Sequence, residues 1–294
     1  MAYVQLFLTF RCNKGCDFCF NRGVNERGDL SINEFIRLSP RLKNYGFREL
    51  DVLGGEPLLH EDIMKLLEIA SENFNPIYLS TNGTIVDDLQ KINEIFPQIK
   101  TGISLNGEMD EKTIRYILSR RPIIKSVVSR ERFIPEKALH FIKKGIPYYL
   151  IFRDILSGDE LRYSMPFYEF IRTFNEIKRG FKNVMPVYCD GFISDKDYRC
   201  PAGTEKLSIM PDGSVYPCYL FFRFDEFRLG NIFKDGMKDI LNSPVLESFK
   251  RYRGNVCPQK LCELHSRCHG GCPAISYAIY GRLDRPDPRC IEYI

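Results

Sequence analysis

Short apolar runs and amphipathic stretches alternate along the first part of the chain. The apolar runs predict strands, at residues 3–9, 49–53, 77–80, 100–105, 123–128 and 148–153. Stretches of helical periodicity follow them, at residues 31–44, 61–73, 86–95, 110–119, 135–144 and 165–179. Ser31 and Glu34 have the spacing of a capping box at the start of the first of these helices.

This alternation of strand and helix predicts a parallel sheet, because each helix must cross over the sheet before the next strand can run the same way. Six such strands can close only part of an eight-stranded barrel. We therefore predict an α/β fold that begins with a partial (β/α)6 barrel of the TIM type.

The pattern changes after residue 186. Helical and strand periodicity weakens, and eight of the eleven cysteines fall between Cys189 and Cys290. A segment with so few long apolar elements needs another source of stability, and metal ligation supplies it because the binding energy becomes folding energy. We predict two domains, the partial barrel over residues 1–186 and a small cysteine-rich domain over residues 187–294.

The composition indicates a folded protein without a membrane span. Of the 294 residues, 44% are hydrophobic, and the net charge of +4 is too balanced to indicate a nucleic-acid partner. No apolar run approaches the roughly 20 residues of a membrane helix, and the start of the chain lacks the basic region of a signal peptide. We expect a cytoplasmic protein whose cysteines bind metal rather than form disulfides. We expect His60 and His140 at its surface.

Three cysteines lie close together directly after the first predicted strand. Cys12, Cys16 and Cys19 have the spacing C-x3-C-x2-C. Most zinc and iron–sulfur sites take four protein ligands. A group of three therefore leaves one metal position open, and an open position indicates chemistry.

Polar and glycine-rich motifs follow the next three predicted strands. They are Leu-Gly-Gly-Glu-Pro at residues 53–57, Ser-Thr-Asn-Gly-Thr at residues 80–84 and Ile-Ser-Leu-Asn-Gly at residues 103–107. Each motif alone is also ordinary turn chemistry. Together, in order and at successive strand ends, they indicate one functional site.

This combination resembles the radical S-adenosylmethionine (SAM) enzymes, whose signature is C-x3-C-x2-C after the first strand with an aromatic residue, here Phe18, before the last cysteine. The resemblance implies that Cys12, Cys16 and Cys19 hold a [4Fe–4S] cluster whose fourth iron binds SAM. It also implies reductive cleavage of SAM to methionine and a 5′-deoxyadenosyl radical that abstracts hydrogen from a substrate. An electron donor such as ferredoxin or flavodoxin is then required.

The same resemblance implies which residues bind SAM. Gly54 and Gly55 have no side chains, so their backbone can approach the methionyl amine, and Glu56 can accept a hydrogen bond from that amine. Ser104 is the first choice for the carboxylate and ribose of SAM, with Asn82 and Asn106 as further candidates.

The cysteines of the second half resemble the SPASM extension of many radical SAM enzymes, which holds two auxiliary [4Fe–4S] clusters. Cys200 and Cys218 fit C-x12-G-x4-C around a hairpin that turns at residues 211–213. A run with the spacing C-x4-C-x5-C-x3-C follows, and the last cysteine stands alone near the end of the chain, at Cys257, Cys262, Cys268, Cys272 and Cys290. The extension usually has two residues, not four, between the first pair of cysteines in this run. The position of Cys257 as a cluster ligand therefore departs from the family pattern.

By position, the resemblance implies that Cys200, Cys218 and Cys272 bind auxiliary cluster I. The ligands of auxiliary cluster II are then Cys257, Cys262, Cys268 and Cys290. Cys189 either completes cluster I, so that all eleven thiols are used, or is a free thiol that delivers a hydrogen atom to a substrate radical. A pair of structural zinc sites is the alternative for this half of the chain.

The resemblance favours an enzyme that modifies a ribosomal peptide or protein, by a crosslink, thioether, epimerisation or oxidation. The alternatives are a small-molecule dehydrogenase or epimerase, for example of an aminosugar, and a non-catalytic metal-binding module. The cysteine motif begins so close to residue 1 that we expect leader binding to need a separate protein or the barrel itself.

Overall fold

The computed structural model describes residues 3–24, 28–105, 107, 109–131, 133–193, 195, 199–251 and 257–290. These residues form two compact units. The first unit combines Met1–Pro122 with Ala202–Phe249, and the second combines Ile123–Pro201 with Lys250–Ile294. Asn106, one of the residues expected to bind SAM, lies outside the described residues.

The first unit contains a sheet with strand β1 (Tyr3–Phe7) at its centre. On one side of β1 lie three parallel strands, β2 (Glu49–Leu53), β3 (Ile77–Thr81) and β4 (Lys100–Ser104). On the other side lie β8 (Lys206–Ile209), β9 (Ser214–Tyr216) and β10 (Gly230–Asn231). The four strands predicted before residue 106 are therefore confirmed.

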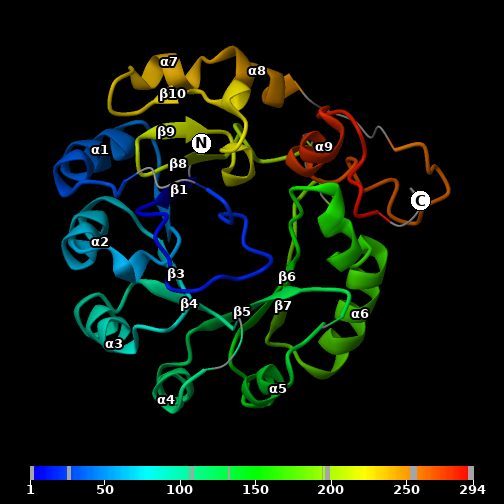
Figure 1. Ribbon diagram of the computed structural model, residues 1–294, viewed down its shortest axis with the longest axis horizontal. Coiled ribbons are helices and arrows are strands. Elements are labelled where there is room, and N and C mark those ends of the chain that lie inside the picture. Colours follow the sequence, from blue (N-terminus) through cyan, green and yellow to red (C-terminus); the bar gives the residue numbers. More distant parts are fainter. Residues whose placement is uncertain are drawn as a thin grey trace. The chain divides into compact units, whose positions relative to one another are not determined.

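Helices cover the outer side of the strands β1 to β4, as Figure 1 shows. They are α1 (Ile32–Asn44), α2 (Ile63–Asn73), α3 (Val86–Ile95) and α4 (Glu111–Arg120). The capping box of α1 is confirmed, because Ser31 Oγ accepts the backbone N–H of Glu34 at 3.2 Å. Phe35, Leu38 and Leu42 of this helix are buried, which is the spacing of one apolar helix face.

One prediction for this unit is wrong. His60 is buried rather than at the surface, with 4% of its area exposed. Its Nε2 lies 2.8 Å from the carbonyl oxygen of Leu30, and its Nδ1 accepts the backbone N–H of Asp62. Both ring nitrogens have partners, so burial leaves neither of them unsatisfied.

Strand β8 pairs with β1 in parallel, although the two strands lie far apart in the sequence. Their register aligns Gln5 with Ser208, and Ser208 Oγ donates to Gln5 Oε1 at 2.8 Å. The predicted hairpin at residues 211–213 is confirmed, since β8 and β9 are antiparallel and Gly213 has a left-handed φ of 79°. The boundary between two domains that the sequence pattern predicts after residue 186 stays a prediction.

The second unit contains three parallel strands in the order β5 (Ile123–Val128), β6 (Tyr148–Phe152) and β7 (Val184–Val187). Its helices are α5 (Glu136–Lys143), α6 (Phe167–Gly180) and α9 (Pro273–Tyr280). Strand β7 was not predicted, because it is short and contains Pro186, a residue that a sheet tolerates where no further strand needs its N–H. The rings of Phe152, Phe167 and Phe192 pack together in the core of this unit.

The helices α7 (Met237–Leu241) and α8 (Pro244–Arg251) complete the described secondary structure, apart from short 3₁₀ turns. Within the described ranges, no helix combines the length and the apolar composition that crossing a membrane requires.

Candidate functional site

The loop after β1 contains the three closely spaced thiols. Cys12 is exposed, whereas Cys16 and Cys19 are half-buried. The backbone N–H of Cys19 donates to the carbonyl of Cys16 at 3.2 Å, which closes a turn between these two residues. Burial raises the pKa of Cys16, and the nearby thiols of Cys19 and Cys12 raise it further. The fold therefore brings the three sulfurs close enough together to affect one another's pKa.

Backbone and amide groups donate to the sulfur of Cys12. The N–H of Lys14 lies 3.4 Å from Cys12 Sγ, and Nδ2 of Asn82 lies 3.7 Å from it. Asn82 also donates to Asn13 Oδ1 at 2.8 Å. Hydrogen bonds of this kind stabilise a thiolate and orient it toward a metal. A set of three soft sulfur donors with N–H partners fits an iron–sulfur cluster.

The two glycines after β2 lie against the backbone of this loop. The N–H of Gly55 donates to the carbonyl of Thr9 at 2.8 Å. A Cβ atom on Gly55 would lie 2.2 Å from the carbonyl oxygen of Arg11, and one on Gly54 would lie 2.8 Å from that of Thr9. The cysteine loop itself therefore requires glycine at both positions. Their expected contact with SAM stays a prediction.

Glu56 is fully buried, and its carboxylate accepts three hydrogen bonds from the protein. Oε1 accepts the N–H of Leu58 at 3.1 Å and the hydroxyl of Thr81 at 2.7 Å, and Oε2 accepts the N–H of Asn82 at 2.6 Å. Burial raises the pKa of Glu56 against the lowering effect of these hydrogen bonds. Glu56 thus joins the turn after β2 to the end of β3, and its expected contact with the amine of SAM stays a prediction.

The expected SAM residues differ in how close they lie to the cysteine loop. Asn82 contacts Cys12, as described above. Ser104 is the last residue of β4 and is half-buried. Its role stays a prediction.

Asn21 is a residue of this site that the sequence did not indicate. Its Nδ2 donates to the carbonyl of Gly54 at 3.0 Å, so it connects the cysteine loop to the turn after β2. Its Oδ1 is buried and has no hydrogen-bond partner among the described residues. A buried acceptor without a donor is costly. Only its position two residues after Cys19 could have drawn attention to it.

A second group of thiols lies in the other unit. Cys189 is close enough to Cys200 and Cys272 for sulfur contacts, and the contact with Cys200 raises the pKa of Cys189 well above its ordinary value. The contact with Cys189 likewise raises the pKa of Cys272. Cys200 and Cys272 are buried, and Cys189 is half-buried. Cys218, which follows β9, belongs to the first unit.

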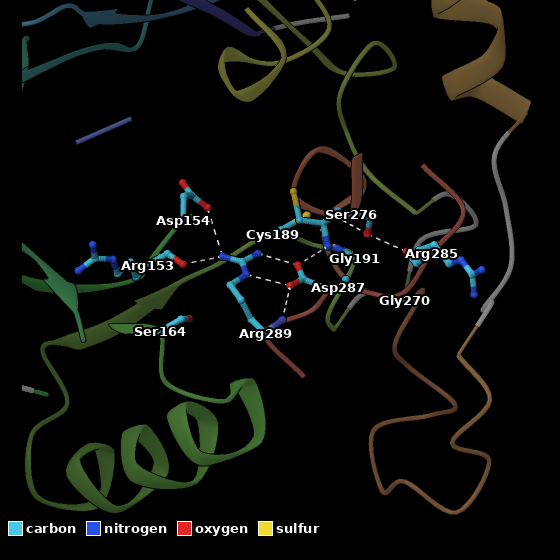
Figure 2. A network of polar contacts seen from close by, with 12 residues as sticks. Arg153, Asp154, Ser164, Cys189, Gly191, Gly270, Ser276, Arg285, Asp287 and Arg289 are labelled. Atoms are coloured by element: carbon cyan, nitrogen blue, oxygen red, sulfur yellow. Dashed lines mark hydrogen bonds and ion pairs between the residues drawn. The ribbon is translucent and has the colours of Figure 1, made fainter. Parts of the chain in front are cut away.

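A buried ion pair between Asp287 and Arg289, both labelled in Figure 2, contacts the backbone of Cys272. Asp287 Oδ2 accepts the backbone N–H of Cys272 at 2.9 Å and pairs with Arg289 Nη2 at 2.7 Å. Arg289 also donates to the carbonyl of Arg153 at 2.7 Å and reaches Asp154 Oδ1 at 3.3 Å. Burial alone would lower the pKa of Arg289, but the charge of Asp287 holds it above its ordinary value. The pair connects Cys272 to the end of β6.

Cys257, Cys262 and Cys268 form a third group. Burial raises the pKa of Cys268, and the nearby Cys257 and Cys262 raise it further. The backbone N–H of Gly270 donates to Cys268 Sγ at 3.3 Å. Across the described residues, no three His, Cys, Asp or Glu side chains have the spacing that holds a single metal ion. The structure shows that the thiols of Cys257, Cys262 and Cys268 lie near one another.

Two parts of the chain match known protein families. Residues 6–134 match the radical SAM superfamily, and residues 200–273 match SPASM, an iron–sulfur cluster-binding domain. These two matches confirm the resemblance to radical SAM enzymes with a SPASM extension. The descriptions of both families agree with the predicted cofactors, SAM and [4Fe–4S] clusters.

Relatives extend the match over most of the chain. It is 26% identical to the antilisterial bacteriocin subtilosin biosynthesis protein AlbA of Bacillus subtilis, over 90% of this chain and 65% of AlbA. It is 22% identical to the PqqA peptide cyclase of Granulibacter bethesdensis, over 96% of this chain and 85% of that protein. This chain therefore spans just under two thirds of the length of AlbA.

The structure of Streptococcus suis SuiB bound to SAM is similar in fold. The TM-score is 0.77 at 20% sequence identity, and the likeness covers 98% of this chain and 77% of SuiB. SuiB has also been solved with its precursor peptide SuiA. This likeness confirms the predicted fold, a partial α/β barrel followed by a cysteine-rich region.

Proposed function

We propose that this chain is a radical SAM enzyme that modifies a ribosomal peptide or protein. The observation that supports this proposal most directly is the pair of relatives that match nearly the whole chain. One is named for the biosynthesis of a bacteriocin, and the other is named a peptide cyclase. The small-molecule dehydrogenase or epimerase remains the alternative, and the substrate test below separates the two.

In this proposal Cys12, Cys16 and Cys19 hold the [4Fe–4S] cluster that binds SAM. Held by these thiols, the cluster would supply the electron, drawn from an external donor such as ferredoxin or flavodoxin, for the reductive cleavage of SAM to methionine and the 5′-deoxyadenosyl radical. The protein's part is to hold and orient. The amide of Asn82 and the N–H of Lys14 support the Cys12 sulfur.

The remaining SAM contacts are proposed from the motifs, at Gly54, Gly55, Glu56, Asn82, Ser104 and Asn106. Glu56 acts in this scheme through the backbone of Asn82 and through the turn that begins at Leu58. Its buried carboxylate fixes the relative position of two strand ends whose loops border the cysteine loop.

Auxiliary cluster I is proposed to use the thiols of Cys189, Cys200 and Cys272. The sulfur contacts of Cys189 with both of the other residues favour a ligand over a hydrogen-atom donor, since a donor thiol must not be held by metal. Cys218 stays a ligand on the evidence of the sequence motif. Auxiliary cluster II is proposed to use Cys257, Cys262, Cys268 and Cys290.

The proposal extends to location and partners. We place the enzyme in the cytoplasm, where reduced thiols persist and clusters assemble. Its partners are the peptide substrate, the electron donor and, if the barrel does not bind the leader, a separate leader-binding protein.

The test is anaerobic reconstitution followed by iron, sulfide and product analysis. The protein should bind about twelve irons, four for each cluster, and the Cys12/Cys16/Cys19→Ala variant about eight. Reduced wild type should release 5′-deoxyadenosine from SAM and the variant should not. Bound zinc with negligible iron and sulfide would contradict the proposal. A mass change in an aminosugar but in none of the candidate precursor peptides would favour the small-molecule alternative.

A further inference from the structure

The segment that follows Cys218 packs against the cysteine loop within the first unit. The ring of Tyr219, in the 3₁₀ turn Tyr219–Phe221, lies 4.7 Å from that of Phe20 between centroids. The ring of Phe222 stacks on Phe10 at 5.6 Å. One aromatic contact thus lies at each end of the loop that contains Cys12, Cys16 and Cys19. Paired rings of this kind add stability beyond the area they bury.

Arg223 completes this contact with hydrogen bonds. Its Nε and Nη2 lie 3.2 and 2.8 Å from the carbonyl oxygen of Phe20, the residue after Cys19. Nη2 also donates to the carbonyl of Arg22. A guanidinium is a planar fork of donors, so it can hold two neighbouring carbonyls in a fixed orientation.

These carbonyls belong to the end of the loop that contains Cys19. The N–H of Arg22 donates back to the carbonyl of Cys19 at 3.0 Å, so residues 19–22 form one turn. The other end of the loop is fixed separately, by the hydrogen bonds from Gly55 and Glu56 to Thr9 and Arg11.

We propose that Arg223 is a positioning residue for the cluster that binds SAM. It fixes the turn that carries Cys19 by holding the carbonyls of Phe20 and Arg22, while Tyr219 and Phe222 pack against the same loop. The SPASM region thereby has a second role besides binding auxiliary clusters, which is to shape the SAM site. This inference rests on the proposed function, because it assumes a cluster at Cys12, Cys16 and Cys19.

The experiment compares Arg223→Ala and Arg223→Lys with the wild type and with Arg228→Ala. Arg228 is exposed in the same unit, so its variant removes an equal charge five residues along the chain without changing the loop contacts. The reconstituted proteins are reduced, and electron paramagnetic resonance spectra are recorded before and after addition of SAM. The SAM-induced change reports only on a cluster with an open iron. Loss of a group that orients a metal ligand typically costs roughly 10- to 100-fold in metal affinity or in activity.

We expect Arg223→Ala to need roughly tenfold or more SAM for the spectral change, or to lose that change, while Arg228→Ala matches the wild type. Arg223→Lys should be intermediate, since an ammonium keeps the charge but not the planar fork. A wild type without any SAM-induced change would contradict the proposed function. A wild-type response with an unchanged Arg223→Ala would overturn the inference alone.

Circular dichroism and thermal melting check that the variants fold. If Arg223→Ala fails to fold, Arg223→Lys decides the question on its own. Wild-type SAM affinity in Arg223→Lys would overturn the proposal, because charge without the carbonyl contacts would then suffice. Weakened SAM affinity in a folded Arg223→Lys would support it.

Discussion

The buried carboxylate of Glu56 accepts the backbone N–H of Asn82 at 2.6 Å, and the side chain of Asn82 in turn donates to the sulfur of Cys12. The turn after β2, the end of β3 and the cysteine loop are therefore connected through two residues. A motif that the sequence presents as three separate stretches is one hydrogen-bonded unit in the structure.

The first prediction concerns the carboxylate oxygens of Glu56, which accept three hydrogen bonds. Glu56→Gln keeps the shape of the side chain but replaces one carboxylate oxygen with an amide NH2. That group faces a donor, because Leu58, Thr81 and Asn82 all donate to the wild-type carboxylate. We expect a loss of about 1–3 kcal/mol in the free energy of unfolding, measured by denaturant titration. An equally stable variant would mean that the three hydrogen bonds are dispensable.

The second prediction is the pH dependence of the same comparison. Burial raises the pKa of Glu56 above the ordinary 4.5. Between about pH 5 and about pH 8 the folded chain therefore binds more protons than the unfolded chain. The contribution of Glu56 to stability therefore falls as pH rises. The stability difference between wild type and Glu56→Gln should be larger at about pH 5 than at about pH 8. The opposite slope would show that the hydrogen bonds outweigh burial.

The third prediction tests the close approach at Gly55. A Cβ there would lie 2.2 Å from the carbonyl oxygen of Arg11, so Gly55→Ala must displace the cysteine loop. We expect a loss of about 1–3 kcal/mol in stability, together with loss of the iron held by that loop. Gly158→Ala is the control, because a Cβ at Gly158 meets no atom within 4 Å. Full iron content in Gly55→Ala would show that the loop can move without losing its cluster.

The fourth prediction separates the two roles of Cys189. As a ligand of auxiliary cluster I, its replacement in Cys189→Ala should lower iron content, alter the cluster spectrum and reduce the melting temperature. As a hydrogen-atom donor, its loss would leave iron and stability unchanged while 5′-deoxyadenosine formation continued with little product. Solvent deuterium would then enter the wild-type product through the exchangeable S–H. Iron analysis and mass spectrometry distinguish the two outcomes.

The fifth prediction concerns the ion pair beside Cys272. Both side chains are almost fully buried, with 1% of Arg289 and 0% of Asp287 exposed. Asp287→Asn leaves a buried guanidinium short of a charge partner and should cost about 3–5 kcal/mol, measured by denaturant unfolding. Asp287→Asn with Arg289→Met should cost less than the single change. Asp284→Asn breaks the exposed pair with Arg282 and should have almost no effect.

The sequence predicted the elements whose signals are local. Alternating apolar residues identified the strands from β1 to β6, and Ser31 with Glu34 identified the start of α1. It could not predict β7, which is four residues long and contains a proline. Nor could it predict that β8 pairs with β1, because nothing local distinguishes a hairpin that stands alone from one that extends a sheet.

The candidate site shows the same division. The cysteine spacings are local and were recognised in the sequence. Asn21, Arg223 and Asp287 were not, because each acts on a partner that only the folded chain brings near. His60 was expected at the surface, although each of its ring nitrogens has a hydrogen-bond partner in the folded chain. Gly55 was selected from the sequence because its backbone could approach the amine of SAM. The structure gives another reason, which is that a Cβ would collide with the carbonyl oxygen of Arg11. Such crowding cannot be seen in the sequence beyond the glycine itself.

The parallel pairing of β8 with β1 has a consequence for protein engineering. Gln5 and Ser208 are neighbours in the sheet although 203 positions separate them in the chain. A shortened chain that ends before β8 would leave β1 with a bare edge, which invites pairing with other chains. A chimera that replaces β1 should therefore replace β8 with it, because the two strands form one parallel pair.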